Sequence, residues 1–446
     1  MKRSSVFQIL TVVFLTFSLL LPALTLAAPI AQAAAPTDPD AALADLANRV
    51  YSTGPNGEAP TAASEVVLTD DEIQQVKDMK ATAAIVLHYG GNDWSNAQVD
   101  GLTATFNDLG IEVISVTDAG FKPEKQVSDI ETVLAEKPDI IVSIPTDPVA
   151  TAKAYKQAAD QGVKLVFMDN VPYEMEAGKD YIAVVSADNY GNGVAAAHLM
   201  AKALGGKGKV GVIYHAADFF VTKQRYEAFK KTIEENYPDI ELVAEQGIGG
   251  PDFAGDAEKA ASAMLTKYSD LAGIWAVWDV PAEGVLAAAR ATGRDDVVVT
   301  TIDLGLNAAV DIAKGGLIYG LGAQRPFDQG VTEAKLAAYG LLGKQAPIYV
   351  ALNALPVTQE NVLDAWETVY HQAPPESLLE SMPEGMKPAA AAAGPTDPDA
   401  ALADLANRVY STGPNGEAPT AASEVVLTDD EIQQVKDMKA TAAIVL

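Results

Sequence analysis

Short apolar runs rich in β-branched residues alternate with segments of helical periodicity from residue 82 onward. The runs predict ten strands, five in a first series at 83–87, 112–116, 139–143, 164–168 and 182–185, and five in a second series at 210–214, 241–244, 272–277, 297–302 and 317–320. Amphipathic helices are expected between them, for example at 127–136, 149–161, 225–236 and 257–267. This alternation predicts an α/β fold with parallel sheets covered by helices on both faces.

The number of predicted strands indicates two lobes. Ten strands are many for one compact sheet, and 446 residues exceed the usual size of one domain. A strand ends in a polar turn at residues 186–190, and we expect the break between the two doubly wound lobes there.

The N-terminal segment is typical of a secretory signal peptide. Lys2 and Arg3 precede an apolar run at 6–26, and Ala31-Gln32-Ala33 fits a small-residue cleavage site, so residues 1–33 are expected to be removed. A retained membrane anchor is the alternative, because the apolar run is nearly long enough to span a bilayer. The chain has no cysteine that could carry a lipid, so we expect a secreted protein, periplasmic or extracellular, that is not a lipoprotein.

The two ends of the chain carry an identical repeat. Residues 36–87 recur letter for letter as residues 395–446, after an expected linker at 373–394. In the first copy, residues 34–81 predict a helical extension: Asp38 can cap one helix, and the Thr69-x-x-Glu72 pattern a second. We expect the second copy to be a loosely held tail. The alternative is strand exchange, in which residues 442–446 replace residues 83–87 in the same or a neighbouring molecule.

Composition excludes several classes of protein. The chain has 60 acidic and 31 basic residues, and its net charge of -29 argues against nucleic-acid binding. The absence of cysteine excludes disulfides, thiolate metal sites and cysteine nucleophiles. Four scattered histidines and no EF-hand spacing predict no metal, and we expect no cofactor. Gly191-x-Gly193-x-x-Ala196 resembles a dinucleotide motif, but the acidic residue that such sites need is missing, which favours helix packing.

Polar and aromatic residues follow several predicted strands. In open parallel sheets, ligands bind at the carboxyl ends of the strands. The residues in those positions are His88, Asn92, Asp93, Trp94, Asp169, Asn170, Trp278, Asp279, Asp303 and Gln324. Indole rings can cover the C–H surface of a polyhydroxylated ligand while carboxylates and amides pair its hydroxyl groups.

Residues 82–370 resemble the ribose-binding type of periplasmic solute-binding protein that serves ABC importers. The resemblance rests on Pro145-Thr146-Asp147, Phe167-Met168-Asp169-Asn170, Ser186-Ala187-Asp188-Asn189, Asp252-Phe253, Thr301-Ile302-Asp303 and Ala323-Gln324-Arg325-Pro326. It implies a type I fold, in which two similar α/β lobes joined by three crossing strands close over one sugar. The expected lobes are 82–187 plus 325–353 and 188–324 plus 354–372.

The resemblance also implies a set of ligand-binding residues. His88, Asn92, Trp94 and Asp169 would line the first lobe; Lys223, Phe253, Trp278 and Asp303 would line the second, with Gln324 near a hinge. His88 as a merely hydrogen-bonded histidine and Phe253 as a loop anchor are alternatives, and His215 with Phe219-Phe220 could also line the site.

The chain departs from the ribose-binding pattern in its cationic and amide positions. Lys223 and Arg225 cannot both face the cleft, because residues two apart on a helix point in different directions, and we choose Lys223. Lysine at 223 and Asn170 replace expected arginines, and Ile144 and Trp278 replace expected amides. These changes predict a site with fewer guanidinium contacts and more aromatic surface, so we do not expect ribose itself.

The sequence therefore predicts a solute-binding protein that captures a sugar or polyol by hinged lobe closure and delivers it to an ABC importer. Its expected partners are the solute and the membrane permease subunits; no nucleic acid is expected, and the protein should be a monomer without enzymatic activity. The alternatives are a sensing module for a chemoreceptor or kinase, a binder of a non-carbohydrate solute, and a glycosidase that uses Asp169 and Asp303 as its acid and base.

Overall fold

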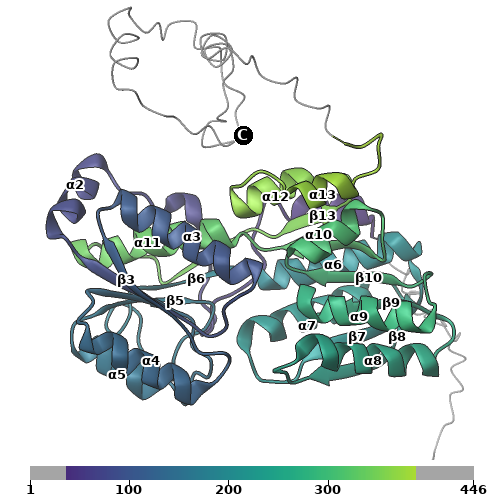
Figure 1. Ribbon diagram of the computed structural model, residues 1–446, viewed down its shortest axis with the longest axis horizontal. Coiled ribbons are helices and arrows are strands. Elements are labelled where there is room, and N and C mark those ends of the chain that lie inside the picture. The colour runs from purple at the N-terminus through teal and green to yellow at the C-terminus, as the bar shows by residue number, and fades with distance from the viewer. Residues whose placement is uncertain (1–36, 388–446) are drawn as a thin grey trace, which may run out of the picture. The chain divides into compact units, whose positions relative to one another are not determined.

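The computed structural model describes residues 37–387, which form two parallel sheets with helices on both faces (Figure 1). The expected signal peptide, the second copy of the repeat and residues 388–394 of the expected linker lie outside the described residues.

The first sheet has seven parallel strands in the order β1-β12-β6-β5-β4-β2-β3. Their bounds are Thr61–Ala62 (β1), Tyr349–Leu352 (β12), Ala183–Ala187 (β6), Lys164–Met168 (β5), Ile140–Ser143 (β4), Thr82–Leu87 (β2) and Glu112–Asp118 (β3). Side chains of β2 alternate between two cores, as the two-residue period of a strand requires. Ile85 packs among residues of α3 (Asp93–Asp108) and α11 (Pro326–Leu342), and Val86 packs among residues of α4 (Pro123–Ala135) and α5 (Ala152–Asp160).

The second sheet has six strands in the order β13-β11-β10-β9-β7-β8, and only β13 at its edge is antiparallel. Their bounds are Leu355–Thr358 (β13), Ile318–Ala323 (β11), Val298–Ile302 (β10), Leu271–Ala276 (β9), Lys207–His215 (β7) and Asp239–Ile248 (β8).

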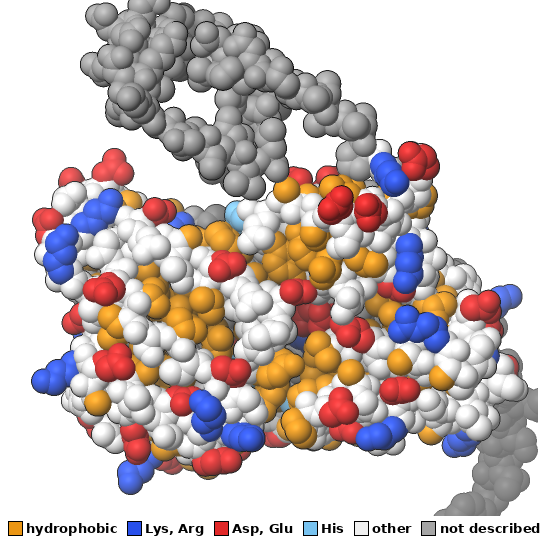
Figure 2. Space-filling view, viewed as in Figure 1, with side chains coloured by type: hydrophobic (Ala, Val, Ile, Leu, Met, Phe, Trp, Pro, Cys, Tyr) orange, Lys and Arg blue, Asp and Glu red, His pale blue; other side chains and the backbone are white. Residues whose placement is uncertain are grey.

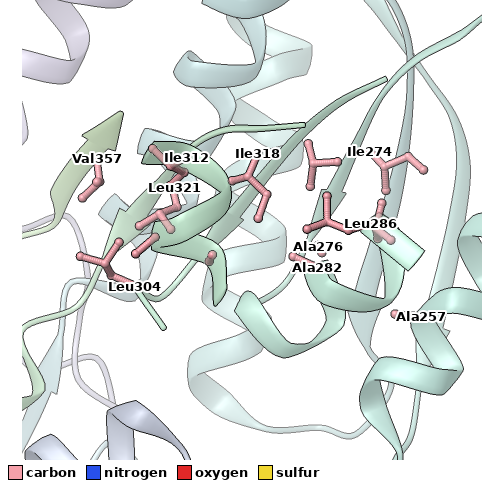
Figure 3. Packing of buried hydrophobic residues seen from close by; sticks show 14 of the residues in the cluster. Ala257, Ile274, Ala276, Ala282, Leu286, Leu304, Ile312, Ile318, Leu321 and Val357 are labelled. Atoms are coloured by element: carbon pink, nitrogen blue, oxygen red, sulfur yellow. The ribbon is translucent and has the colours of Figure 1, made fainter. Parts of the chain in front are cut away.

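Helices cover both faces of the second sheet. One face packs against α6 (Asn189–Leu204) and α7 (Phe220–Asn236), with Trp275 fully buried between them. The other face packs against α8 (Phe253–Lys267), α9 (Asp279–Thr292), α10 (Leu306–Ala313), α12 (Val362–Tyr370) and α13 (Glu376–Ser381). Figure 3 shows this second core, in which Ile274 and Ala276 of β9 and Leu321 of β11 face the surrounding helices.

The chain passes between the two sheets three times. It crosses after β6 into α6, after β11 into α11, and between β12 and β13. The predicted fold class, two doubly wound lobes with a three-crossing hinge, is therefore confirmed.

All ten predicted strands are present, with ends displaced by a few residues. The sequence analysis did not predict β1, β12 and β13, which have only two to four residues each. Runs this short give too few apolar positions to show a period.

Residues 37–80 are built into the lobes. They contain α1 (Pro39–Asp45), β1, a 3₁₀ turn at Ala63–Glu65 and α2 (Asp70–Met79), so the expected purely helical extension also contains a strand. The predicted capping box is present, because Glu72 N donates to Thr69 Oγ1 at 3.3 Å and Thr69 N donates to Glu72 Oε2 at 2.8 Å. Within the described part of the chain, no helix is both long and apolar enough to cross a bilayer.

Candidate ligand-binding site

A cavity lies between the carboxyl ends of the two sheets. The first lobe lines it with His88, Tyr89, Asn92, Trp94, Phe121, Ile144 and Asp169; the second lobe lines it with His215, Phe219, Val221, Thr222, Arg225, Trp278, Asp279, Val280 and Asp303. Gln324, at the second crossing, completes the lining. Figure 2 shows one face of the molecule, and acidic side chains gather in its middle, between the elements of the two lobes.

Asp169 is a buried carboxylate of the first lobe. It follows β5 and is 2% exposed, and Ser186 Oγ donates to its Oδ1 at 2.5 Å. Burial raises the pKa of Asp169 to about 6, and the negative charge of Asp303 acts in the same direction. The Ser186 hydrogen bond and the positive charge of Arg225 lower this pKa and so limit the rise. Asp169 is thus an acceptor placed close to charged groups of the other lobe.

Asp303 is held from two sides in the second lobe. Gln324 Nε2 donates to its Oδ1 at 2.7 Å, and Arg225 Nη1 donates to its Oδ2 at 3.2 Å. Arg225 is 4% exposed, and its Nε donates to Asn189 Oδ1 at 2.8 Å. A guanidinium group bonded in this way is fixed in orientation. A ligand therefore meets a donor, Arg225, and an acceptor, Asp303, that are already in place.

The choice of Lys223 over Arg225 was wrong. The Lys223 side chain is 57% exposed, and its Nζ lies 3.6 Å from Asp218 Oδ1, outside the cavity lining. The buried face of α7 contains Val221, Arg225 and Ala228, which are spaced three or four residues apart. That apolar spacing was a signal in the sequence that favoured Arg225. The site has therefore kept a guanidinium group that the sequence analysis considered lost.

Aromatic rings from both lobes form the walls of the cavity. The His88 ring stacks on Phe219 of the opposite lobe, with centroids 5.7 Å apart and planes 13° apart. The ring centroids of Phe121 and Tyr89 are 4.9 Å apart, and those of Trp278 and His215 are 5.6 Å apart. The sequence analysis did not select Tyr89 and Phe121, because neither belongs to a recognised motif.

Phe253 does not line the cavity but supports its wall. Its ring is 4% exposed and contacts Trp278 at 4.9 Å and Phe121 at 5.5 Å. The alternative reading, in which Phe253 anchors a loop, agrees with this position. Its expected direct contact with the ligand is not supported by the lining.

His88 and Trp94 line the cavity with polar atoms that have no partner among residues 37–387. His88 Nδ1 and Trp94 Nε1 are buried without a hydrogen bond among the described residues. Burial lowers the pKa of His88 to about 3, and burial together with the charge of Arg225 lowers the pKa of His215 to about 4. Both imidazole rings are therefore neutral at pH 7.

Asn92 and Asp93 begin α3. Asn92 Oδ1 accepts a hydrogen bond from Ser95 N at 2.9 Å, so Asn92 caps the helix as well as lining the cavity. Asp93 Oδ2 accepts a hydrogen bond from Leu306 N at 2.7 Å, which joins the first lobe to the start of α10 in the second.

Asp279 lines the cavity; it was expected at the carboxyl end of a strand but not among the ligand-binding residues. Val280 N donates to its Oδ1 at 2.9 Å. Burial raises the pKa of Asp279 to about 8, with further contributions from the negative charges of Asp303, Glu283 and Asp93. This corner of the cavity therefore concentrates carboxyl groups.

The arrangement suits recognition of a small hydroxylated solute. Carboxylates accept hydrogen bonds from hydroxyl groups, Arg225 donates them, and the rings cover apolar surface. Among residues 37–387, no three histidine or acidic side chains are arranged to hold a metal ion.

Comparisons with known proteins point to one family. The family model of the periplasmic binding protein domain matches residues 83–345. The chain is 26% identical over 270 residues to a ribose import binding protein of Salmonella typhimurium, covering 60% of this chain and 86% of that protein. It is also 26% identical over 274 residues to a D-ribose/D-allose-binding protein of Pseudomonas aeruginosa, covering 60% and 84%.

Solved structures show the same similarity. An ABC sugar transporter subunit from Rhodobacter sphaeroides is 29% identical with a TM-score of 0.56, covering 63% of this chain and 99% of that chain. A solute-binding protein from Agrobacterium vitis bound with alpha-D-tagatopyranose is 25% identical with a TM-score of 0.60, covering 65% and 99%.

Proposed function

We propose that this chain, which belongs to the periplasmic binding protein family, captures a sugar or polyol outside the cytoplasm and delivers it to an ABC importer. The observation that carries the proposal is the cavity between the lobes, to which both lobes contribute hydrogen-bonding groups and aromatic rings. The similar proteins from Salmonella typhimurium and Agrobacterium vitis are described as binding ribose and tagatose, which supports a solute of this class.

Capture follows from closure of the two lobes. Asp169 belongs to the first lobe, and Arg225 and Asp303 belong to the second, so a ligand contacts all three only when the lobes are closed. Because the ligand has more contacts in the closed state, it shifts the population towards that state. A membrane permease can then distinguish the loaded from the empty protein by its shape.

Each group in the cavity has a proposed role. Asp169 and Asp303 accept hydrogen bonds from ligand hydroxyls, and Arg225 donates to ligand oxygens. Trp94 and Trp278 cover the C–H faces of the ligand, and Gln324 bonds it near the second crossing. His88 and Asn92 complete the wall of the first lobe.

The remaining parts of the proposal concern partners and location. We propose that residues 1–33 direct export and are removed, that no lipid is attached, and that the protein works as a monomer with the permease subunits of an importer.

We also propose that it catalyses no reaction. Incubation with glycosides should release no product over hours, whereas steady hydrolysis abolished by Asp303→Asn would contradict this.

Ligand binding can be tested by calorimetry with pentoses, hexoses and polyols on the mature protein from residue 34. Asp169→Asn should weaken binding about ten- to a hundredfold, because a charged acceptor in a buried hydrogen bond contributes about 1.5–3 kcal/mol. Lys223→Ala is the matched control on the second lobe, since that side chain is exposed, and it should leave affinity unchanged. Equal affinities of the wild-type and Asp169→Asn proteins would exclude Asp169 as a ligand contact.

A further inference from the structure

The charges that line the cavity are not balanced. Three carboxyl groups, those of Asp169, Asp279 and Asp303, face one guanidinium group, that of Arg225. The two imidazole rings add no positive charge at neutral pH, because burial lowers the pKa of each to about 4 or below. Arg225 forms its ion pair with Asp303, so its charge is already matched. Asp169 and Asp279 therefore have no cation of their own among the lining side chains.

Asp279 is a lining carboxyl group with few favourable contacts. Within residues 37–387, it receives one hydrogen bond, from Val280 N, and takes part in no ion pair. The charged groups that act on it are Asp303 and Asp93 of other elements and Glu283 of its own helix, and it in turn acts on Tyr89 and Tyr370. None of these groups is a cation. Placing a carboxylate in such surroundings is costly unless a positive charge joins it.

The backbone makes room for Asp279 in this corner. A Cβ atom on residue 305 would overlap with Asp279 Oδ2, so glycine at this position leaves the carboxylate where it lies. A small space, with room for about one water-sized group, is lined by Gly305, Trp94, Asp279, Asp303 and Gln324, among others. It shares Trp94, Asp279, Asp303 and Gln324 with the main cavity.

Unpartnered polar atoms in the same space indicate that a ligand group belongs there. Gln324 is 3% exposed, and its Oε1 accepts no hydrogen bond from the described residues. Trp94 Nε1, a donor, is also buried there without a partner among the described residues, and a hydroxyl oxygen of the ligand would accept its hydrogen bond. An ammonium group between Asp279 and Gln324 Oε1 would supply the missing donors, and the aromatic walls would stabilise its charge further. An inorganic ion fits less well, because the described side chains include no metal-ligating group of three.

We propose that the solute is a cationic polyol, namely a sugar or polyol derivative with a protonated amine that binds beside Asp279. Its hydroxyl groups then meet Asp169, Arg225 and Asp303. The inference rests on the proposed capture of a hydroxylated solute and adds the charge of that solute.

The test compares pairs of ligands that differ at one position. Calorimetry is performed with N-methyl-D-glucamine against D-glucitol, D-glucosamine against D-glucose, and an inosamine against inositol. In at least one pair, the amine should bind at least about tenfold more tightly than its neutral partner. This is the gain expected from a charged hydrogen bond in a cleft that is partly shielded from water. Its N-acetylated form, which keeps the shape of the ring but loses the charge, should lose this advantage.

Asp279→Asn supplies the decisive variant. It is isosteric and should reduce the affinity for the amine to about that for the neutral partner. Asp218→Asn is the control, since Asp218 is exposed and does not line the cavity. Neutral members that bind as tightly as the amines, with no effect of Asp279→Asn, would overturn the inference and leave the proposed function intact. If neither the amines nor the broader set of neutral sugars bind, the proposed function fails as well.

Proton release is an independent readout. At pH 7 the carboxyl group of Asp279 is largely protonated in the empty site, and a bound ammonium group lowers its pKa. Titrations in buffers of different ionisation enthalpy should therefore show release of up to about one proton per amine bound, and Asp279→Asn should abolish it. Tight amine binding with no proton release in the wild-type protein would place the ammonium group elsewhere.

Discussion

Asp169 and Asp303 both adopt left-handed backbone angles at the ends of their strands, with φ of 55° and 71°. This region costs most L-residues about 1–2 kcal/mol, and aspartate is among the few that occupy it as single residues. In each lobe, the strained residue is also the buried acceptor that faces the cavity. Asp169 and Asp303 thus adopt an unfavourable backbone conformation at positions that line the cavity. Backbone strain of this kind is common at binding sites.

Glu333 is a second buried acid, which lies behind the site. It is fully buried on α11, and both carboxyl oxygens lack a partner among the described residues, as do the amide groups of Gln98 and Gln329. Burial raises the pKa of Glu333 well above its usual value, and the negative charge of Asp169 raises it further. The carboxyl group is therefore expected to be protonated at neutral pH.

Glu333 and Asp279 make stability depend on pH. A carboxyl group with a raised folded-state pKa stabilises the fold fully below its unfolded pKa, near 4, and this contribution is lost as pH rises through the folded pKa. Buried histidines oppose this trend only below about pH 6.5, where the unfolded imidazole is protonated. The thermal midpoint of the ligand-free protein should therefore fall between pH 6.5 and 8.5.

The variant Glu333→Gln should reduce that fall, because the side chain can no longer ionise. The expected change is at most about 1.4 kcal/mol per pH unit for each proton involved. Glu131→Gln, on the exposed face of α4, is the matched control. A pH profile of Glu333→Gln parallel to that of the wild type would contradict the assignment.

At the scale of elements, the contact between α3 and α11 positions the first wall of the cavity. A Cβ atom on Gly101 of α3 would overlap with the backbone of Phe327, so glycine allows the two helices to approach closely. Because α3 begins at the cavity, this packing fixes where Asn92, Asp93 and Trp94 lie. The site thus depends on a helix contact whose residues, Gly101 and Phe327, lie outside the cavity lining.

The hydrogen bond between Asp93 and Leu306 N should favour the closed state. Asp93→Ala removes an acceptor that joins the start of α3 to the start of α10 across the lobes. Such a charge-assisted bond contributes about 1–2 kcal/mol, so ligand affinity should fall about five- to thirtyfold. The radius of gyration of the loaded protein, measured by X-ray scattering, should also increase at subsaturating ligand.

Asp100→Ala, on the exposed side of the same helix, serves as the control. Its affinity and scattering should match those of the wild type. Unchanged affinity in Asp93→Ala would show that this contact forms in the open state as well.

At the scale of the whole molecule, the N-terminal segment joins both lobes. In the second lobe, Lys202 Nζ lies 2.6 Å from Asp40 Oδ1. At the first crossing, the backbone of Tyr51 and Ser52 donates to the Asp188 carboxylate at 2.8 Å. In the first lobe, β1 extends the sheet beside β12. Residues 37–80 are therefore part of the folded protein.

The identical second copy, residues 395–446, lies outside the described residues, and we propose that it is a tail. Truncation after Gly394 should leave the melting midpoint and the monomeric state unchanged, because the first copy already occupies the contacts described above. Light scattering and thermal melting on both lengths of chain test this. A dimer that forms only with the full-length chain would support strand exchange instead.

The sequence alone predicted the α/β class, the two lobes and most strands, and the family resemblance added the three crossings. Strand and helix periods are local, and they repeat often enough along this chain to be read without knowing which segments meet. Asp169, Asp303 and Gln324 were selected for the same reason, since the ends of parallel strands share one edge of a sheet. The capping box formed by Thr69 and Glu72 was also predictable, because its two partners are three residues apart.

Only the tertiary structure decided which side chains face the cavity. The choice between Lys223 and Arg225 depends on which side of α7 packs against the second sheet, and the sequence analysis chose incorrectly. Tyr89, Phe121 and Asp279 gained their importance from neighbours distant in the chain, such as Phe253 beside Phe121 and Asp93 beside Asp279. Local patterns determine secondary structure because they act over a few residues, whereas burial, pKa and contacts across the lobes arise only when distant segments pack together.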